Sequence, residues 1–223
     1  MKLRHEWKHE INASDRMLLR QRLRAVMKTD AHADQGIYKV RSLYFDNAAD
    51  KVLLEKINGI QCREKFRMRY YNDDTSMIML EKKSKFNGLG SKQSATLTKE
   101  EARLLAEGRY DWMLESGREL LCELYAKIRT QGLQAKTIVD YTREAFVCEA
   151  GNVRVTLDSN IRTGLGSTDF LNPECVTIPA GSQFAVLEVK WDAFLPDAVR
   201  SAVQLTGRRT AAFSKYQVCR MYG

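Results

Sequence analysis

A short stretch of the chain carries a basic residue at every second position. In the segment Cys62-Arg63-Glu64-Lys65-Phe66-Arg67-Met68-Arg69-Tyr70-Tyr71, the basic residues are Arg63, Lys65, Arg67 and Arg69. A period of two places all four on one face of a β-strand. Like charges this close repel each other, so such a row is stable where a polyanion or opposed carboxylates neutralise it. The stretch therefore predicts a strand whose charged face meets anionic groups.

The same alternation recurs in several other segments. The residues that share a charged face are Arg4, Glu6, Lys8 and Glu10; Glu81, Lys83 and Lys85; Arg154, Thr156 and Asp158; and Glu188 and Lys190. A single alternating strand normally turns its charged side to solvent. Carboxylates mixed with cations on each face suit instead a barrel interior that holds metal ions and phosphates. We therefore expect an α+β fold, with a closed antiparallel β-barrel, a charged lumen and helices packed on the outside.

Length and composition limit the class of protein. The chain has 223 residues, 44% of them hydrophobic, and a net charge of +8, which favours anionic partners. Without linkers or repeats, a single domain over residues 1–223 is expected. Five cysteines lack CxxC spacing, and neither a signal peptide nor an apolar stretch of membrane-spanning length is visible. These features predict a soluble cytoplasmic protein.

The remaining pattern predicts strands interrupted by a few helices. Strands are expected near residues 3–11, 39–46, 62–71, 77–86, 136–148, 152–162 and 184–191. Helices are expected near residues 49–57, 98–107, 114–129 and 197–205. Another helix should begin at Asn12 or Ser14 and end near residue 28, with an apolar side formed by Met17, Leu18, Leu23, Val26 and Met27. The glycine-rich segment 88–92 is interpreted as a loop between strands.

The segment His5-Glu6-Trp7-Lys8-His9 matches the HExxH pattern of zinc proteases. That chemistry requires a helix, which places the two histidines one turn apart. The alternation favours a strand, so zinc hydrolysis is not expected and His5 and His9 are assigned to the outer face. The sequence contains neither GxxxxGK[ST] nor GxGxxG, so a nucleotide site would have to use side chains.

Taken together, the segments resemble the polyphosphate polymerase domain of the vacuolar transporter chaperone (VTC) complex, within the triphosphate tunnel metalloenzymes. The resemblance extends from Arg4 to about Tyr222. Seven segments carry it in the family's order: Arg4-His5-Glu6-Trp7-Lys8, Arg41-Ser42-Leu43-Tyr44-Phe45-Asp46, Arg67-Met68-Arg69-Tyr70, Leu80-Glu81-Lys82-Lys83, Tyr141-Thr142-Arg143-Glu144-Ala145-Phe146, Leu187-Glu188-Val189-Lys190 and Phe213-Ser214-Lys215-Tyr216. Arg4 replaces the first glutamate of the ExExK signature of tunnel triphosphatases, and Lys85 stands where the eukaryotic polymerases have histidine.

The resemblance implies roles for particular side chains. The expected catalytic, phosphate-gripping set is Lys8, Arg67, Arg69, Lys83, Arg143 and Lys215. Further substrate-binding residues are expected to be Arg63, Lys65, Lys85, Lys92, Tyr141, Arg154 and Lys190. The resemblance assigns Mn²⁺ or Mg²⁺ to Glu188, and we add Glu6 as a second candidate ligand.

The implied function is a metal-dependent transfer of the ATP γ-phosphoryl group to a polyphosphate chain, with release of ADP. Glu6 and Glu10 keep a second reading open, in which a tunnel-fold triphosphatase hydrolyses triphosphate or nucleoside triphosphates. A non-catalytic polyanion-binding module is the third. The expected partners are ATP, polyphosphate and pyrophosphate, together with a separate membrane protein. The chain itself is expected in the cytoplasm, with a peripheral position at the inner membrane face as an option. Nucleic acid is not expected, because aromatic residues do not interleave with the cations.

Overall fold

The computed structural model describes residues 4–31, 36–87, 89–181, 184–205, 207 and 213–221. The chain divides into two compact units. Unit 1 consists of Met1–Lys39, Tyr141–Ile161 and Gly181–Phe213, and unit 2 of Val40–Asp140, Arg162–Ala180 and Ser214–Gly223. Three strands contribute residues to both units: β3 (Ile37–Asp46), β7 (Gln134–Cys148) and β8 (Val153–Thr163). The single domain over residues 1–223 that the sequence predicts stays a prediction.

Unit 1 is built on strands in the order β1–β10–β8–β7, and β2 also pairs with β7. Its further elements are β1 (His5–Ile11), α1 (Ala13–Val26), β2 (Lys28–Thr29), a short 3-10 helix (Ala150–Asn152), β10 (Ala185–Trp191) and α6 (Asp197–Val203). The β1–β10 and β10–β8 pairs are antiparallel. The HExxH segment thus lies entirely in strand β1, as the alternation predicts. The ring of His5 stacks on Trp191 with centroids 5.3 Å apart.

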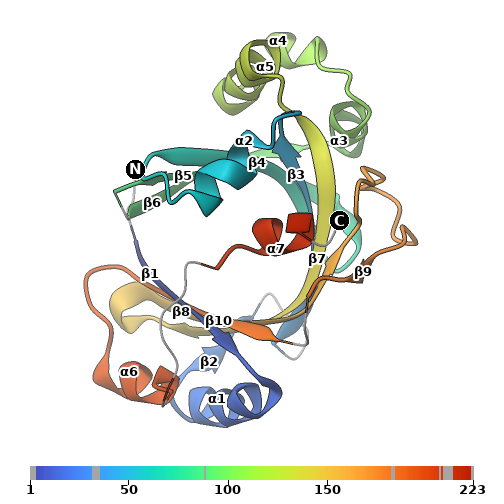
Figure 1. Ribbon diagram of the computed structural model, residues 1–223. Coiled ribbons are helices and arrows are strands. Elements are labelled where there is room, and N and C mark those ends of the chain that lie inside the picture. Colours follow the sequence, from blue (N-terminus) through green and yellow to red (C-terminus); the bar gives the residue numbers. More distant parts are fainter. Residues whose placement is uncertain are drawn as a thin grey trace. The chain divides into compact units, whose positions relative to one another are not determined.

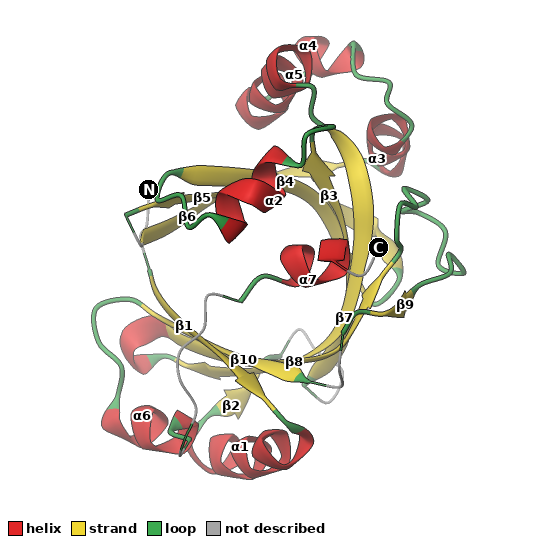
Figure 2. Cartoon of the chain, in the orientation of Figure 1, coloured by secondary structure: helices red, strands yellow, loops and turns green. Residues whose placement is uncertain are grey.

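The apolar core of unit 1 lies between its sheet and α1 and α6. Alternate residues of β8 and β10, such as Val155 and Leu187, pack there against Leu19 and Leu23 of α1. Asn12 caps α1 in a capping box with Asp15. Asn12 is one of the two residues at which the sequence predicts that this helix begins. Figure 2 shows α1 and α6 as helices lying against the strands of this unit.

The predicted apolar side of α1 is wrong at three positions. Met17, Leu18 and Val26 are 61%, 40% and 40% exposed, whereas Leu19 is buried. The stripe that faces the sheet passes through Leu19 and Leu23, four residues apart. An apolar periodicity predicts the helix, but the angle at which it docks decides which apolar residues are covered.

Unit 2 has the strand order β7–β3–β4–β5–β6, and β9 pairs with β8. Its further elements are α2 (Lys51–Ile57), β4 (Arg63–Tyr71), β5 (Asp74–Phe86), β6 (Leu89–Leu97), α3 (Lys99–Ala106), α4 (Trp112–Glu115), α5 (Glu119–Gln131), β9 (Ile178–Pro179) and α7 (Lys215–Met221). The β3–β4, β4–β5 and β5–β6 pairs are antiparallel. Within this unit, α3, α4 and α5 lie over one side of the strands and α7 over the other (Figure 1).

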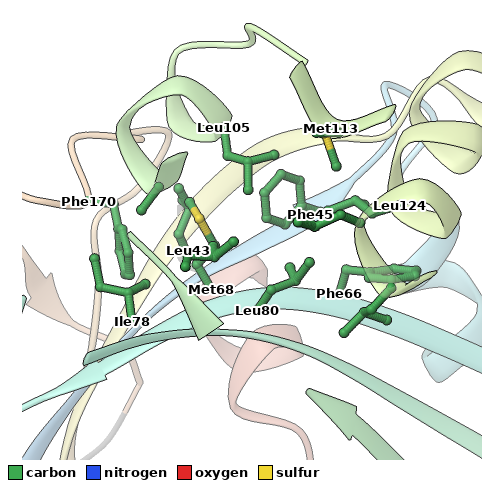
Figure 3. Packing of buried hydrophobic residues seen from close by; sticks show 14 of the residues in the cluster. Leu43, Phe45, Phe66, Met68, Ile78, Leu80, Leu105, Met113, Leu124 and Phe170 are labelled. Carbon is green, nitrogen blue, oxygen red and sulfur yellow. The ribbon is translucent and has the colours of Figure 1, made fainter. Parts of the chain in front are cut away.

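The core of unit 2 lies under α3, α4 and α5. Phe45, Phe66 and Leu80 from the strands meet Leu105 of α3 and Leu124 of α5 in one buried cluster (Figure 3). Burying each such side chain stabilises the fold by about 1.5–3 kcal/mol. Because these residues alternate with the charged ones, this core fixes the direction in which the charged face of β3, β4 and β5 points.

Three elements of unit 2 differ from the sequence-based expectation. The helix expected over 114–129 is two helices, α4 and α5, separated by Gly117 with a φ of 64°, a conformation that glycine adopts without strain. Leu89 to Lys92, interpreted as loop, belong to β6. Helix α7 was not expected, because its few residues carry no clear apolar period.

The α+β class, with an antiparallel sheet and helices such as α1, α3, α5 and α6 packed on its apolar side, is confirmed. Helix α7 lies instead over the charged side of unit 2. Closure into a barrel stays a prediction, because the described strand order ends at β1 of unit 1 and at β6 of unit 2. Alternation of side chains predicts which face of a strand is polar, but closure depends on strand tilt and stagger, which alternation does not encode.

Candidate functional site

The charged face of unit 2 is organised around one buried carboxylate, that of Glu81. Pairing of β4 with β5 places Arg67 directly opposite Glu81. Arg67 Nε donates to Glu81 Oε2 at 2.7 Å, and Lys92 Nζ of β6 donates to Oε1 at 2.6 Å. Arg69 Nη1 lies 3.8 Å from the same carboxylate, which is 2% exposed. We call Arg67, Arg69, Glu81 and Lys92, together with Tyr44, the Glu81 cluster.

The charges of the Glu81 cluster support one another. Burial alone raises the pKa of Glu81, but Arg67, Arg69 and Lys92 outweigh burial and hold that pKa far below its usual value. Glu81 is therefore ionised throughout the physiological range and fixes both arginines. Ser42 Oγ accepts a further hydrogen bond from Arg69 Nε at 2.9 Å.

Tyr44 of β3 completes the Glu81 cluster. Its hydroxyl accepts a hydrogen bond from Arg67 Nη1 at 2.8 Å, and Lys65 Nζ lies 5.5 Å from its ring centroid. Burial alone raises the pKa of Tyr44, but the positive charges of Arg67, Lys65 and Arg69 outweigh it and lower the pKa to about 7. A phenol ionises this easily because the cations around it attract negative charge.

Beyond Glu81, cations of β4, β5 and β6 oppose one another. Arg63 lies opposite Lys85, and Lys65 opposite Lys83. Lys83 in turn lies opposite Lys92. An anion lying across these strands would meet several cations at once. Arg63 also donates to the backbone carbonyl of Ile60.

Helix α7 lies over the charged face of unit 2 (Figure 1). The ring of Tyr216 stacks on Tyr44 with centroids 5.0 Å apart, and its hydroxyl donates to Asp46 Oδ2 at 2.6 Å. Arg220 Nη2 also pairs with Asp50 Oδ1 at 2.8 Å. These contacts fix the helix that begins at Lys215, one of the predicted catalytic residues.

The charged face of unit 1 centres on Glu188. Strand pairing places Lys8 opposite Glu188 and Glu6 opposite Lys190. Lys8 Nζ lies 3.5 Å from Glu188 Oε1 and 3.2 Å from Glu6 Oε2. Lys190 Nζ lies 3.1 Å from Glu188 Oε1 and 3.5 Å from Glu6 Oε1. We call these four residues, with Arg143, the Glu188 cluster.

The cations of the Glu188 cluster are held in the charged form. Burial alone lowers the pKa of Lys8, but Glu188 and Glu6 outweigh burial and raise it. Arg143 Nε and Nη2 donate to the two carboxylate oxygens of Asp158 at 2.6 and 2.7 Å, and Nη2 lies 3.6 Å from Glu188 Oε2. Burial alone lowers the pKa of Arg143 as well, yet Asp158 more than compensates, so it stays well above its usual value.

Tyr141 and Arg154 are two further residues of unit 1 that are predicted to bind substrate. The ring centroid of Tyr141 lies 5.2 Å from Arg143 Cζ. Arg154 Nη2 instead pairs with Asp30 Oδ2 at 2.5 Å and donates to the Tyr38 hydroxyl at 2.8 Å. Arg154 therefore shares the predicted face but contacts groups outside the Glu188 cluster.

Glu6 and Glu188 supply carboxylate oxygens, the ligand type that Mg²⁺ and Mn²⁺ prefer, and metal binding by them stays a prediction. Both share Lys8 and Lys190 as ion-pair partners, which places them close together. Over residues 4–31, 36–87, 89–181, 184–205, 207 and 213–221, no group of three or more His, Cys, Asp or Glu side chains is arranged to hold a metal. Mg²⁺ is commonly held by one or two carboxylates together with substrate phosphates and water. A metal here would need such additional oxygens.

Eight of the predicted residues belong to the two clusters, whereas Arg63, Lys65, Lys83, Lys85, Tyr141, Arg154 and Lys215 lie outside both as defined. Sequence reasoning found the cations of both, together with Glu6 and Glu188, but it gave no site role to Tyr44, Glu81, Asp158 or Tyr216. Glu81 and Asp158 were recognised on the charged faces of their strands, and this position was the available signal. Nothing in the local pattern marks Tyr44 or Tyr216.

The lowered pKa of Tyr44 predicts a pH dependence of anion binding. As the pH rises through about 7, ionised Tyr44 adds a negative charge beside Arg67, so affinity for tripolyphosphate should fall about tenfold relative to Tyr44→Phe. Calorimetric titration of the wild type and of Tyr44→Phe with tripolyphosphate between pH 6 and 9 measures both affinities. The ratio of the two affinities removes the effect of the ligand's own ionisation, because both proteins meet the same ligand. A constant ratio over this range would contradict the effect.

Comparison with known proteins identifies the family. The sequence pattern of the VTC domain matches residues 3–222. The chain belongs to the VTC domain family. Membership supports a function in polyphosphate or triphosphate chemistry, and the resemblance given by the seven segments is confirmed. No curated protein matches this VTC domain.

A solved structure shares the fold of the VTC domain at low identity. A candidate adenylate cyclase from Bacillus halodurans is 14% identical, with a TM-score of 0.51 over 85% of this chain and 80% of that chain. A Pyrococcus horikoshii protein is also 14% identical, with a TM-score of 0.45 over 90% of this chain and 85% of that chain.

Among the helices in the described part of the VTC domain, none has the length and apolar character needed to cross a membrane.

Proposed function

We propose that this VTC domain transfers the γ-phosphoryl group of ATP to the end of a polyphosphate chain and releases ADP. The observation that carries the proposal is the opposition of cations on β4, β5 and β6. Lys83 lies between Lys65 and Lys92 across two strand pairs. An extended polyanion with a charge on every phosphate would meet a cation on each of these strands along its length.

The chain's own residues supply positioning and charge. The acceptor is already an anionic phosphate oxygen, so the transfer needs no strong general base. In unit 2, Arg67 and Arg69, held by Glu81, are proposed to orient phosphate oxygens and to stabilise charge that develops during transfer. In unit 1, Arg143, held by Asp158, is proposed to contact phosphate in the same way. Rigid guanidinium groups are suited to this task because little reorganisation accompanies reaction.

Glu188 and Glu6 are the residues that would hold Mg²⁺ or Mn²⁺. When bound, the ion would neutralise phosphate charge and help align the reacting groups. Lys8 and Lys190 lie against the same carboxylates and would contact the phosphates beside them. In this proposal their ammonium groups screen the negative charge that gathers as donor and acceptor approach.

A triphosphatase of the same fold is the second candidate. It is favoured by the contact between Glu6 and Lys8, which keeps part of the ExExK arrangement on β1. It would use the same cations and differ in passing the phosphoryl group to water. Separating the products of ATP turnover on a gel with a polyphosphate stain distinguishes the two, because the hydrolase yields free phosphate without chains. A binding module yields neither.

We expect Glu188→Gln to lower chain synthesis about 100-fold or more and to raise the Mn²⁺ concentration needed for half-maximal rate. The change removes the negative charge but keeps the size of the side chain, so the loss reflects charge stabilisation worth several kcal/mol. Gel-based synthesis assays over a Mn²⁺ series measure both quantities.

Glu144→Gln is the matched control for this change. Glu144 and Glu188 are both 5% exposed and both lie in unit 1, but Glu144 pairs with Arg20 of α1. Its substitution should lower stability and leave synthesis per folded molecule unchanged. Equal synthesis by Glu188→Gln and Glu144→Gln would remove Glu188 from the mechanism.

A further inference from the structure

Thr156 of β8 has a buried hydroxyl without a hydrogen-bond partner among the described residues. The residue is 3% exposed. Leaving a buried donor unsatisfied costs about 1–3 kcal/mol, and the great majority of buried polar side chains in native proteins have a partner. A hydroxyl that pairs with nothing in the described protein is therefore expected to have a partner from outside it.

The position of Thr156 indicates what that partner is. Thr156 lies on the charged face of β8 and directly opposite Glu188 on β10. The apolar neighbours on β8, Val155 and Leu157, belong to the core under α1 and α6 instead. The unpartnered hydroxyl is thus placed among the charged side chains of the Glu188 cluster.

Two carboxylates on this charged face, those of Glu188 and Asp158, already pair with cations. Glu188 interacts with Lys8, Lys190 and Arg143, and Asp158 receives two hydrogen bonds from Arg143. A donor on the residue opposite Glu188, whose partners are these cations, is suited to a ligand that is anionic and rich in acceptor oxygens. A phosphate group has both properties.

We propose that the Thr156 hydroxyl donates a hydrogen bond to a phosphate oxygen of the substrate bound at the Glu188 cluster. This inference rests on the proposed function, because it takes ATP or polyphosphate as the ligand. Lys8, Lys190 and Arg143 provide the attraction, while the neutral and rotationally restricted threonine fixes one oxygen in place. Thr156 is in this sense a substrate-positioning residue of unit 1.

The test compares Thr156→Val, which keeps the shape and removes the hydroxyl, with Thr156→Ser, which keeps the hydroxyl. Removing an unsatisfied group should leave the melting temperature of the free protein unchanged or higher. Affinity for tripolyphosphate, measured by calorimetry in EDTA, should fall about tenfold in Thr156→Val and by less than about threefold in Thr156→Ser.

Thr137→Val supplies the opposite control. The Thr137 hydroxyl is buried but lies 3.3 Å from the Ile138 carbonyl oxygen and 3.4 Å from Thr163 Oγ1. Its substitution should lower the melting temperature and leave tripolyphosphate affinity unchanged. Thr156→Val is thus expected to lower tripolyphosphate affinity without lowering the melting temperature, and Thr137→Val to do the reverse.

Three results would overturn the inference. Unchanged tripolyphosphate affinity in Thr156→Val would show that the hydroxyl does not contact phosphate. A loss confined to Mn²⁺ binding, titrated without phosphate, would make Thr156 a metal ligand instead. Absence of tripolyphosphate binding by the wild-type protein would overturn the proposed function as well. Unchanged affinity in Thr156→Val would overturn only the role of Thr156, so the two failures can be told apart.

Discussion

Replacing Glu81 with alanine is expected to lower the free energy of unfolding by about 3–5 kcal/mol. The substitution leaves Arg67 and Arg69, which are 8% and 4% exposed, without the carboxylate that compensates their buried charge. Urea denaturation followed by circular dichroism measures the loss. Tripolyphosphate should stabilise Glu81→Ala more than it stabilises the wild type, because the added anion replaces the missing charge.

The stability supplied by Glu81 should also depend on pH. Its pKa is lowered on folding, so the contribution is complete above the ordinary glutamate pKa of about 4.3 and declines as the pH falls below that value. The difference in stability between wild type and Glu81→Ala should therefore narrow on acidification. A difference that widens below pH 4 would contradict this assignment.

Glu64→Ala is the control for Glu81→Ala. Glu64 lies on the neighbouring strand β4 and pairs with Lys127 and Lys82, but its side chain is 30% exposed. Partly exposed ion pairs contribute little, so a loss below about 1 kcal/mol is expected. Equal losses of unfolding free energy in Glu64→Ala and Glu81→Ala would show that burial does not make the Glu81 ion pairs more stabilising than exposed ones.

Replacing Arg67 with alanine is expected to lower polyphosphate synthesis by about 100-fold or more, and Arg143→Ala should act in the same direction. Loss of one preorganised donor that stabilises transition-state charge typically has this effect. Arg67→Lys should recover only part of the rate, because an ammonium lacks the planar fork of donors. Initial rates at saturating ATP and Mn²⁺, corrected for the folded fraction, measure the change.

Arg41 provides a matched arginine on the other side of unit 2. It is 7% exposed and pairs with Asp140, with Nη2 2.8 Å from Oδ2. Its partner on β4 is Tyr70, which belongs to the apolar core. Arg41→Ala should therefore destabilise the protein while folded molecules keep their turnover. Equal turnover in Arg41→Ala and Arg67→Ala would exclude Arg67 from the reaction.

The sequence predicts the charged faces well because alternation is a local property. Arg67 and Glu188 lie on the polar sides of their strands because Phe66 and Leu187 occupy the buried positions next to them. Partner choice is not local. That Glu81 fixes Arg67, or that Asp158 fixes Arg143, depends on strand register, which residue patterns leave open.

Other features required long-range information. Tyr44 and Tyr216 are far apart in the chain, and their stacking follows from the docking of α7 on unit 2. The exposed side of α1 has the same origin, because it depends on how this helix packs against the sheet of unit 1. Thr156 was recognised on a polar face, but its lack of a partner is visible only with its surroundings in place.

The central claim is that phosphoryl groups pass from ATP to a growing chain. Phosphorus-31 NMR of wild-type protein with ATP and Mn²⁺, with and without a short polyphosphate primer, tests it most directly. The proposal predicts a growing signal from internal phosphates of the chain, with one ADP released for each phosphate added. Orthophosphate accumulating in step with ADP, without internal chain phosphates, would contradict it and identify a hydrolase.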